Sequence, residues 1–292
     1  MIVILTALGI EQDAVLEHLD DVEVHEHDKG TLFEVGAIAG HPRHRVAVGI
    51  TGAGTTTAAT LTERARAEFS PQVMMFVGIA GGLRDTLAIG DVVVATKIHS
   101  YQGGRSEDEE FLVRPRSWEL SHRLDQAARR VSRGHRWREF LLDGPVDRPE
   151  PEVFFEPIAV GDVVLNSRRS DIARRIHSSY NDAIAVEMEG SGFAHAAALG
   201  DQVPAVVIRG ISDHANGTKA RSDRAGSQAI AARSAAAFAI AFATALPPKP
   251  RKTTPDPHPG IPPMPPIHNE VIARDNAKVD KQIGMQFTWG QR

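Results

Sequence analysis

Residues 183–190 read Ala-Ile-Ala-Val-Glu-Met-Glu-Gly, an apolar, strand-like run that stops at Glu187 and Glu189. The Ala-rich segment Gly190–Leu199 follows at once and reads as a helix. A strand that passes directly into a helix is the repeating unit of α/β proteins, which keep their ligand sites at the ends of strands. The run therefore predicts an α/β fold with candidate site residues at Glu187 and Glu189.

A second strand-like run, Ala205–Ile211, ends in the same way at Ser212 and Asp213. Carboxylates from two neighbouring strand ends can converge on one small polar ligand. Each motif alone has a structural alternative, because acidic residues are favoured in the first turn of a helix and a Ser-Asp pair often forms a cap or a turn. Only the two motifs together point to a binding site.

Two glycine loops, Gly49–Gly54 and Val77–Leu83, lie upstream, and each follows an apolar run. A strand, a glycine turn and a helix let backbone amides approach a ligand closely. Neither loop is a dinucleotide fingerprint, and the chain has no GxxxxGK[ST] phosphate loop. We therefore expect no cofactor. None of the 13 histidines lies in an HExxH segment, and we expect no metal site.

Apolar runs alternate with helical patterns along most of the chain. The predicted strands are Ile2–Leu8, Thr31–Ile38, Arg45–Ile50, Val73–Ile79, Val92–Ile98, Ile158–Leu165, Ala183–Val186 and Ala205–Ile211. The predicted helices are Glu11–Leu19, Thr56–Phe69, Ser117–Val131, Arg169–Ser178, Gly190–Leu199 and Gly226–Leu246. This alternation predicts a three-layer α/β/α sandwich around a mixed, largely parallel, twisted sheet.

Composition restricts the classes of function. The chain has 292 residues, a formal net charge of −4 and no cysteine, which excludes disulfides, thiolate metal sites and a cysteine nucleophile. Residues 1–246 carry a net charge of −7, which argues against nucleic-acid binding. The N-terminus lacks a basic region, and the apolar run Ala235–Ala243 is too short to span a bilayer. We expect a cytoplasmic protein without a membrane segment.

The C-terminal part differs from the rest of the chain. Ten of the twenty residues of Pro247–Pro266 are proline, which predicts an extended, semi-rigid linker. The 26 residues of Ile267–Arg292 are too few to fold alone. We therefore expect a catalytic domain at 1–246, a linker at 247–266 and a short tail at 267–292.

Several motifs in chain order resemble the nucleoside phosphorylase/nucleosidase superfamily, and within it the methylthioadenosine/S-adenosylhomocysteine nucleosidases. The similarity covers about residues 1–246. The details at Tyr101–Arg105 and Phe111–Pro115 are most similar to the nucleosidase-like effector domains of bacterial and fungal immune-type proteins. The matching segments are Leu5-Thr6-Ala7-Leu8-x-x-Glu11, Thr51–Gly54, Gly78–Leu83, Gly90–Val94, Val186–Glu189 and Arg209-x-Ile211-Ser212-Asp213.

The resemblance implies a phosphorylase/hydrolase-like fold and cleavage of a purine N-glycosidic bond. It implies that Asp213 protonates the leaving purine as a general acid, which requires a carboxyl that keeps its proton near neutral pH. Glu189 would bind the ribose hydroxyls, and Met188 would pack against the ribose, although it can equally be a core residue. Glu187 can have either a binding or a structural role.

The nucleophile distinguishes a hydrolase from a phosphorylase. Glu11 stands, without a gap, where the hydrolytic branch carries its water-activating carboxylate, although a glutamate in a first helical turn is also ordinary. Phe76 and Ile79 stand where hexameric purine phosphorylases carry a phosphate-binding Arg and Ser. The resemblance therefore implies hydrolysis to free base and a ribosyl product, with a purine nucleoside phosphorylase as the alternative.

Other features leave the substrate open. Where the nucleosidases stack adenine on a phenylalanine, this chain has Val163 and Val164. Arg105 and Arg114 are candidate contacts for a 5′-phosphate, so a nucleotide such as ATP is an alternative to methylthioadenosine or S-adenosylhomocysteine. Further candidate substrate contacts are Ile79, Gly81, Arg209 and Ser212.

The tail suggests a partner. Between Val279 and Trp289 a period-two pattern runs through Val279, Lys281, Ile283, Met285, Phe287 and Trp289, and it resembles short amyloid-signalling motifs of bacterial effectors and their sensors. The tail can recruit a sensor protein, or it is a disordered or docking segment. The function is then either a housekeeping purine nucleosidase or a signal-recruited defence effector, and a non-catalytic binding module is a third reading. The family resemblance implies a homodimer or a higher homo-oligomer.

Overall fold

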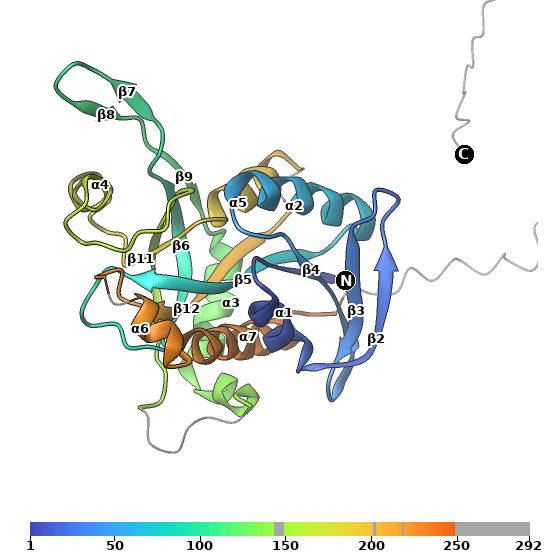
Figure 1. Ribbon diagram of the computed structural model, residues 1–292. Helices are drawn as coiled ribbons and strands as arrows, with labels where there is room; N and C mark the ends of the chain where they lie inside the picture. Colours follow the sequence, from blue (N-terminus) through green and yellow to red (C-terminus); the bar gives the residue numbers. More distant parts are fainter. Residues whose placement is uncertain (143–148, 201–202, 218, 249–292) are drawn as a thin grey trace, which may run out of the picture. The chain divides into compact units, whose positions relative to one another are not determined.

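A mixed sheet of ten strands forms the centre of the part of the chain that the computed structural model describes, residues 1–142, 149–200, 203–217 and 219–248 (Figure 1). The strands that form the sheet's main path have the order β11-β10-β6-β12-β5-β1-β4-β3-β2, and β9 pairs with β6. Their bounds are β1 Ile2–Thr6, β2 Leu19–Glu26, β3 Leu32–Ile38, β4 His41–Ile50, β5 Val73–Gly82, β6 Val92–Ser100, β9 Arg116–Glu119, β10 Val153–Val160, β11 Ala185–Glu187 and β12 Ala205–Asp213.

The helices and a small hairpin complete the described elements. The hairpin consists of β7 (Gly104–Ser106) and β8 (Phe111–Val113), which pair with each other and project from the sheet (Figure 1). The helices are α1 Gly9–Leu16, α2 Thr55–Phe69, α3 His122–Arg133, the 3-10 helix η1 Arg136–Phe140, α4 Asp171–Ser179, α5 Gly190–Leu199, α6 Lys219–Arg224 and α7 Ser227–Ala245.

The apolar strands are buried on both faces because alternate side chains enter two different cores. In β1, Ile2 and Ile4 belong to the core beneath α1, α3 and α7, whereas Val3 and Leu5 belong to the core beneath α2 and α5. Figure 1 shows these two groups of helices on opposite sides of the sheet. A continuous apolar run is the pattern expected of such a doubly covered strand. The predicted α/β/α sandwich is confirmed.

The parallel strands bring their carboxyl ends together. β4, β1, β5 and β12 are parallel neighbours, as are β6, β10 and β11, and β11 also pairs with β5 in the antiparallel sense. The sheet therefore curls until β11 meets β5 near Gly81. Polar residues that follow several strands along the chain consequently meet in one region, as the rule for α/β sheets predicts.

Three predicted elements were wrong in type or extent. Ser117–Glu119 is not helical but lies in β9, where Trp118 pairs with Ile98 of β6, and α3 begins only after the cap residue Ser121. The first predicted helix ends at Leu16, because Leu19 already pairs with Ile38 as the start of β2. The strand predicted at Ile158–Leu165 is observed as β10, Val153–Val160, which begins and ends earlier in the sequence than predicted.

Helix α7 is the one described helix with the length and apolar composition of a membrane span. Its Ala and Phe side chains, Phe238 and Phe242 among them, are buried in the core, and it contacts β12 and β5. The apolar character of α7 is thus accounted for by its position as a core helix.

We expect deletion of residues 247–292 to leave the melting temperature of the remaining chain essentially unchanged. Met1–Lys249 forms one compact unit, and α7 closes it with Leu246 buried and its carbonyl bonded to the His44 ring at 3.0 Å. The predicted linker and tail lie outside the described residues, except for Pro247 and Pro248. Calorimetry of the truncated and full chains tests this, and a truncated chain that unfolds would show that the tail belongs to the fold.

Candidate active site

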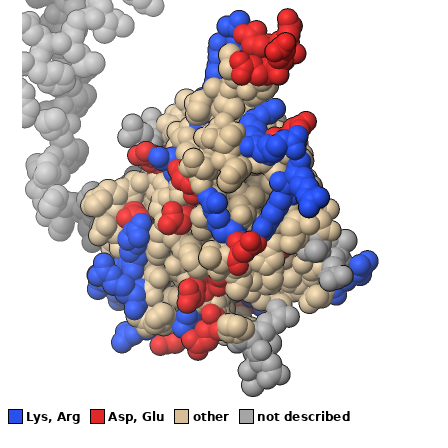
Figure 2. All heavy atoms as spheres, turned by 90° about the vertical axis from the view of Figure 1, so that its left-hand side faces the viewer, with Lys and Arg blue, Asp and Glu red and all other residues tan. Residues whose placement is uncertain are grey.

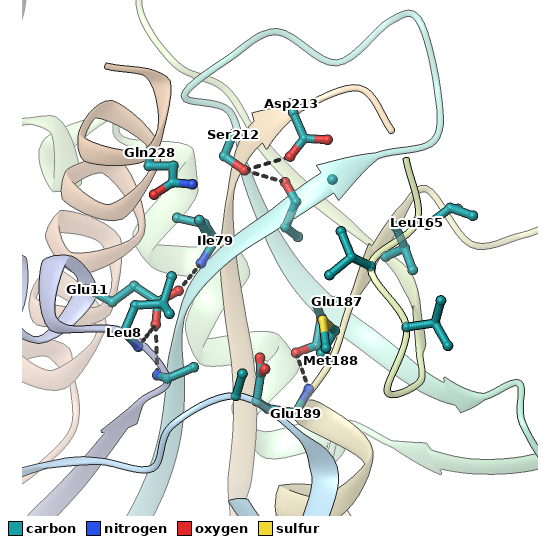
Figure 3. Close-up of a pocket in the computed structure, with 17 residues that line it drawn as sticks. Leu8, Glu11, Ile79, Leu165, Glu187, Met188, Glu189, Ser212, Asp213 and Gln228 are labelled. Carbon is teal, nitrogen blue, oxygen red and sulfur yellow. Dashed lines mark hydrogen bonds between the residues drawn. The ribbon is translucent and has the colours of Figure 1, made fainter. Parts of the chain in front are cut away.

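A cavity of about 270 Å³ opens at the carboxyl ends of β1, β5, β10, β11 and β12 (Figure 3). Figure 3 shows Glu11 and Ile79 on one side, Ser212 and Asp213 on a second, and Met188 and Glu189 on a third. The structure thus brings together residues from distant parts of the chain, such as Glu11 and Asp213. The sequence-predicted residues that line the cavity are Glu11, Ile79, Gly81, Val163, Val164, Glu187, Met188, Glu189, Ser212 and Asp213.

Glu11 is held by three backbone amides. Its Oε2 accepts hydrogen bonds from the N–H groups of Ala7 and Leu8 at 2.8 and 2.9 Å, and its Oε1 accepts one from Ile79 at 2.8 Å. Glu11 therefore satisfies the backbone N–H of Leu8, the N-cap residue of α1, and also faces the cavity. Burial raises its pKa, while the Arg209 guanidinium and the three amides act in the opposite direction.

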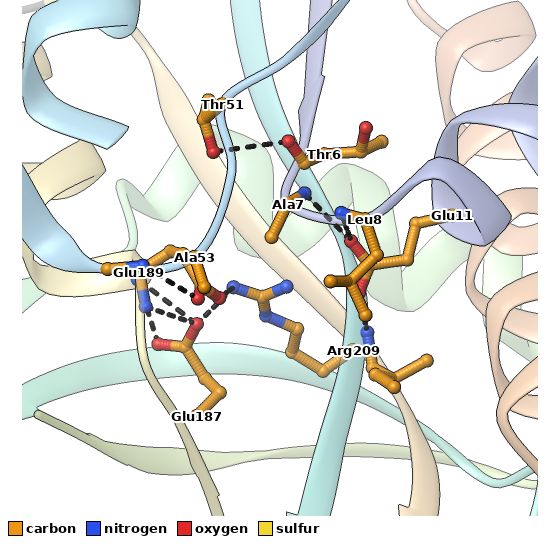
Figure 4. Close-up of polar contacts among 12 residues, drawn as sticks. Thr6, Ala7, Leu8, Glu11, Thr51, Ala53, Glu187, Glu189 and Arg209 are labelled. Atoms are coloured by element: carbon orange, nitrogen blue, oxygen red, sulfur yellow. Dashed lines mark hydrogen bonds and ion pairs between the residues drawn. The ribbon is translucent and has the colours of Figure 1, made fainter. Parts of the chain in front are cut away.

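Arg209 lies beneath the cavity among three carboxylates (Figure 4). Its side chain is fully buried, its Nη2 donates to Glu187 and, at 3.1 Å, to Glu189, and its guanidinium lies 4.7 Å from the Phe76 ring centroid. Its Nη1 has no hydrogen-bond partner among the described residues. Arg209 does not line the cavity, and its single positive charge offsets only part of the negative charge of the carboxylates that do.

Glu187 has a structural role that the structure makes explicit. Its carboxylate accepts hydrogen bonds from the N–H groups of Glu189 and Gly190, and so caps the start of α5, besides pairing with Arg209. The helix N-terminus favours this negative charge. Glu187 also contributes to the cavity wall, so the two readings of this residue are compatible.

Glu189 is a buried carboxyl group with a raised pKa. Burial raises its pKa to about 7, against the opposing charge of Arg209, and Glu187 adds to the increase. Its Oε1 accepts a hydrogen bond from the Gly54 N–H at 3.2 Å, which favours the charged form. The carboxyl can therefore gain or lose a proton in the physiological range.

Asp213 ends β12 with a buried carboxyl. Its Oδ1 accepts a hydrogen bond from the Ala215 N–H at 2.9 Å, and its Oδ2 accepts one from the Ser212 hydroxyl at 3.1 Å. These contacts fix the orientation of the carboxyl group. Gly81 lies directly beside it, since a side chain there would meet Asp213 Oδ1 at 3.2 Å.

Val163 and Val164 lie in a loop after β10, with exposed fractions of 38% and 57%. They form an apolar wall opposite the carboxylates, together with the buried Leu165. Gln228, which was not predicted as a site residue, reaches the cavity from the first turn of α7. No motif marked that residue, because a single glutamine in an Ala-rich helix carries no pattern.

Arg105 and Arg114 are not among the cavity-lining residues. Arg105 belongs to the projecting hairpin, is 60% exposed and pairs with Glu107 at 2.6 Å. Arg114 follows β8 and is also exposed. Figure 2 shows this projection with acidic residues gathered at its tip and basic residues beside and below them. Within one described chain, a 5′-phosphate role for these arginines has no geometric support.

We expect Gly78→Ala to destabilise the protein and to reduce any activity of the cavity. A Cβ at this position would collide with Arg209 Nη1 and with the Glu11 carboxylate, whose Cδ would lie 2.7 Å away. Overpacking of this kind costs about 1–3 kcal/mol. Thermal unfolding measures the effect, and Gly134→Ala, where the nearest atom would lie at 3.8 Å, is the matched control. Equal melting temperatures of the two variants would contradict the packing described here.

The chain matches a known protein family over most of its length. A family model described as the phosphorylase superfamily matches residues 1–246. The chain is 31% identical over 202 residues to the 5′-methylthioadenosine/S-adenosylhomocysteine nucleosidase of Mycobacterium tuberculosis. The aligned part covers 62% of this chain and 73% of the relative. The chain is also 27% identical over 238 residues to the ATP nucleosidase Cap17 of Escherichia coli, and this aligned part covers 75% of the chain and 46% of the relative. The chain thus spans about half the length of that relative.

Solved structures show the same fold. The 5′-methylthioadenosine/S-adenosylhomocysteine nucleosidase of Neisseria meningitidis in complex with methylthio-immucillin-A superposes with a TM-score of 0.69 at 23% identity. The similarity covers 84% of this chain and 99% of that one. The futalosine hydrolase of Helicobacter pylori has a TM-score of 0.68 at 24% identity, over 84% and 97% of the two chains.

Proposed function

The chain belongs to the phosphorylase superfamily, among its nucleosidases, and we propose that it is a purine nucleosidase, which hydrolyses the N-glycosidic bond of an adenine nucleoside. One observation carries this proposal: the carboxyl groups of Asp213, Glu189 and Glu11 face one cavity from three sides. Cleavage of this bond needs a proton for the base, a partner for the cationic ribosyl group and an activated nucleophile. The three carboxyl groups can supply one each.

In the proposed mechanism Asp213 protonates the departing purine, which lies against the apolar wall of Val163 and Val164. Glu189 accepts hydrogen bonds from the ribose hydroxyls, and as a carboxylate it stabilises the positive charge that develops on the sugar. Met188 packs against the ribose. The Gly54 amide and Arg209 keep Glu189 oriented for this contact.

Glu11 is the proposed base that activates water. Its three amide contacts fix the carboxylate at the cavity wall, and the nearby Arg209 guanidinium lowers its pKa against the effect of burial. A water that donates a hydrogen bond to this carboxylate within the cavity would have the base on one side and the ribosyl carbon on the other.

The charge of the cavity favours hydrolysis over phosphorolysis. Of the described residues that line it, none is Lys or Arg, whereas Glu11, Glu187, Glu189 and Asp213 are acidic. Inorganic phosphate would enter this wall of carboxylates without a cationic clamp, and like charges repel. The same argument favours an uncharged 5′ group, as in methylthioadenosine, near the ribose.

Cleavage of ATP is the second candidate, and the match to an ATP nucleosidase over three quarters of this chain supports it. In this reading the protein is a defence effector, and the tail at 267–292 recruits a sensor protein. The phosphates would have to leave the acidic cavity toward solvent or meet cations of another subunit. A homodimer or higher oligomer and a cytoplasmic location complete this proposal.

A substrate panel tests the proposed function. The purified protein is incubated with adenosine, methylthioadenosine, S-adenosylhomocysteine, AMP and ATP, and chromatography follows the release of free adenine. We expect release from at least one uncharged nucleoside. Release from ATP alone would select the second candidate, and no release from any substrate would support a non-catalytic binding module.

A further inference from the structure

One turn of the chain contacts both walls of the cavity. The turn consists of Gly54 and Thr55, at the start of α2. The Gly54 N–H donates to Glu189 Oε1 at 3.2 Å. The next residue, Thr55, donates its N–H to Asp162 Oδ1 at 2.7 Å and its hydroxyl to Asp162 Oδ2 at 2.8 Å. Two successive residues therefore connect the carboxylate on one wall with the loop that forms the other.

Asp162 belongs to the loop that carries the apolar wall, residues 161–165. Gly161, at the start of this loop, lies against Tyr101, because a side chain there would meet the ring at 2.5 Å, and its carbonyl accepts a hydrogen bond from the Tyr101 hydroxyl at 3.4 Å. The loop thus packs against Tyr101 and is hydrogen-bonded to Thr55 of α2 through Asp162. Since Asp162 itself is exposed, core packing does not explain this bond.

We propose that Asp162 is a positioning residue: by holding Thr55, it keeps the Gly54 amide on Glu189 and keeps the 161–165 loop over the cavity. This inference rests on the proposed function for its catalytic consequence. The structural alternative is that Asp162 only caps α2, whose N-cap residue, Gly54, has no side chain to do so. The two roles differ in whether replacing Asp162 changes the pKa of Glu189.

The surroundings of Glu189 show why the Gly54 amide matters. The charged groups that face it are Arg209 on β12, Glu187 on β11 and Glu11 on α1, and the Gly54 amide of the α2 turn completes the set. Arg209 and the amide lower the pKa of Glu189, while Glu187 and Glu11 raise it. If the turn moves away, the carboxylate loses one of its two stabilising contacts, and its pKa increases further.

The test compares Asp162→Ala, which removes both bonds to Thr55, with Asp162→Asn, which can accept from the Thr55 amide and donate to its hydroxyl. Thr60→Ala is the control, because this hydroxyl contacts only a carbonyl within α2. The first readout is kcat/KM against pH. We expect Asp162→Ala to lower it roughly 3- to 10-fold more at pH 6 than at pH 8.5, as loss of one hydrogen bond implies. Asp162→Asn should restore most of the wild-type profile.

The second readout does not depend on activity. Carboxyl-¹³C-labelled glutamate is incorporated, the Glu189 resonance is identified by its absence in Glu189→Gln, and its titration is followed by NMR. Its midpoint should move to higher pH in Asp162→Ala and stay in place in Thr60→Ala. An unchanged midpoint, or a kcat/KM reduced equally at every pH, would leave Asp162 as a helix cap and overturn the inference.

An inactive wild-type protein and an unfolded Asp162→Ala variant can each be distinguished from a failure of the inference. If the wild-type protein releases no base, the proposed function fails, while the NMR titration still decides whether Asp162 acts on Glu189. If Asp162→Ala unfolds, Thr55→Val removes only the hydroxyl bond and should give a smaller shift in the same direction. A folded Thr55→Val protein without any shift would then contradict the inference.

Discussion

Replacing Asp213 with Asn should reduce base release by roughly 100- to 10,000-fold, the usual contribution of a general acid, while the protein stays folded. An asparagine can keep both local contacts, since its carbonyl oxygen can accept from the Ala215 amide and its amide can donate to the Ser212 hydroxyl. The substitution therefore removes the proton that the purine needs without changing the shape of the cavity. Single-turnover measurement of free adenine provides the rate.

The control for this substitution is Asp91→Asn. Asp91 is similarly buried and likewise accepts two hydrogen bonds, in its case both from backbone amides, those of Ala88 and Glu152, but it does not line the cavity. Its variant should retain the wild-type rate within several-fold. If Asp213→Asn retained a rate within a few-fold of wild type, Asp213 would have no part in proton transfer.

Replacing Glu11 with Gln should reduce the rate by a similar factor, because an amide cannot take a proton from water. This substitution is also expected to lower stability. The carboxylate accepts three backbone N–H groups, and the NH₂ of glutamine would face at least one of them, at a cost of about 1–3 kcal/mol. We expect the affinity for substrate to change little, since in the proposed mechanism Glu11 contacts the attacking water.

Equilibrium binding, thermal unfolding and base release together separate these effects of Glu11→Gln. Glu17→Gln, at the other end of the same helix and outside the cavity, is the control for loss of one negative charge. A folded Glu11→Gln protein that releases base at the wild-type rate would exclude Glu11 as the base.

Much of the fold was predictable because the central strands are apolar on both faces, which makes their runs continuous and easy to recognise. β2 was missed because it is an edge strand in which Asp20, Glu23 and Glu26 face solvent, so it has no apolar run. Ser117–Glu119 was assigned to a helix because the residues with which it pairs, Lys97 to His99 of β6, lie about twenty residues earlier in the sequence. Local sequence carries no record of such a partner.

The site was predictable where residues follow a strand directly, as Glu187, Glu189 and Asp213 do. Arg209 was expected to contact substrate, whereas it lies beneath the cavity and balances the carboxylates. That arrangement depends on three segments packing together, which spacing alone does not reveal. The sequence also did not predict that Arg105 lies on a projecting hairpin. The direction of this hairpin depends on the path of the chain after β6, which is a property of the tertiary structure.

Hydrolysis and phosphorolysis are distinguished by a product analysis of the wild-type protein acting on methylthioadenosine, with and without inorganic phosphate. We expect free adenine and an equal amount of free reducing sugar, at a rate that phosphate does not change, because the described cavity lining has carboxylates and no Lys or Arg to bind phosphate. Proton and phosphorus NMR identify both products. Base release that requires phosphate and yields a ribosyl 1-phosphate would contradict the hydrolytic mechanism.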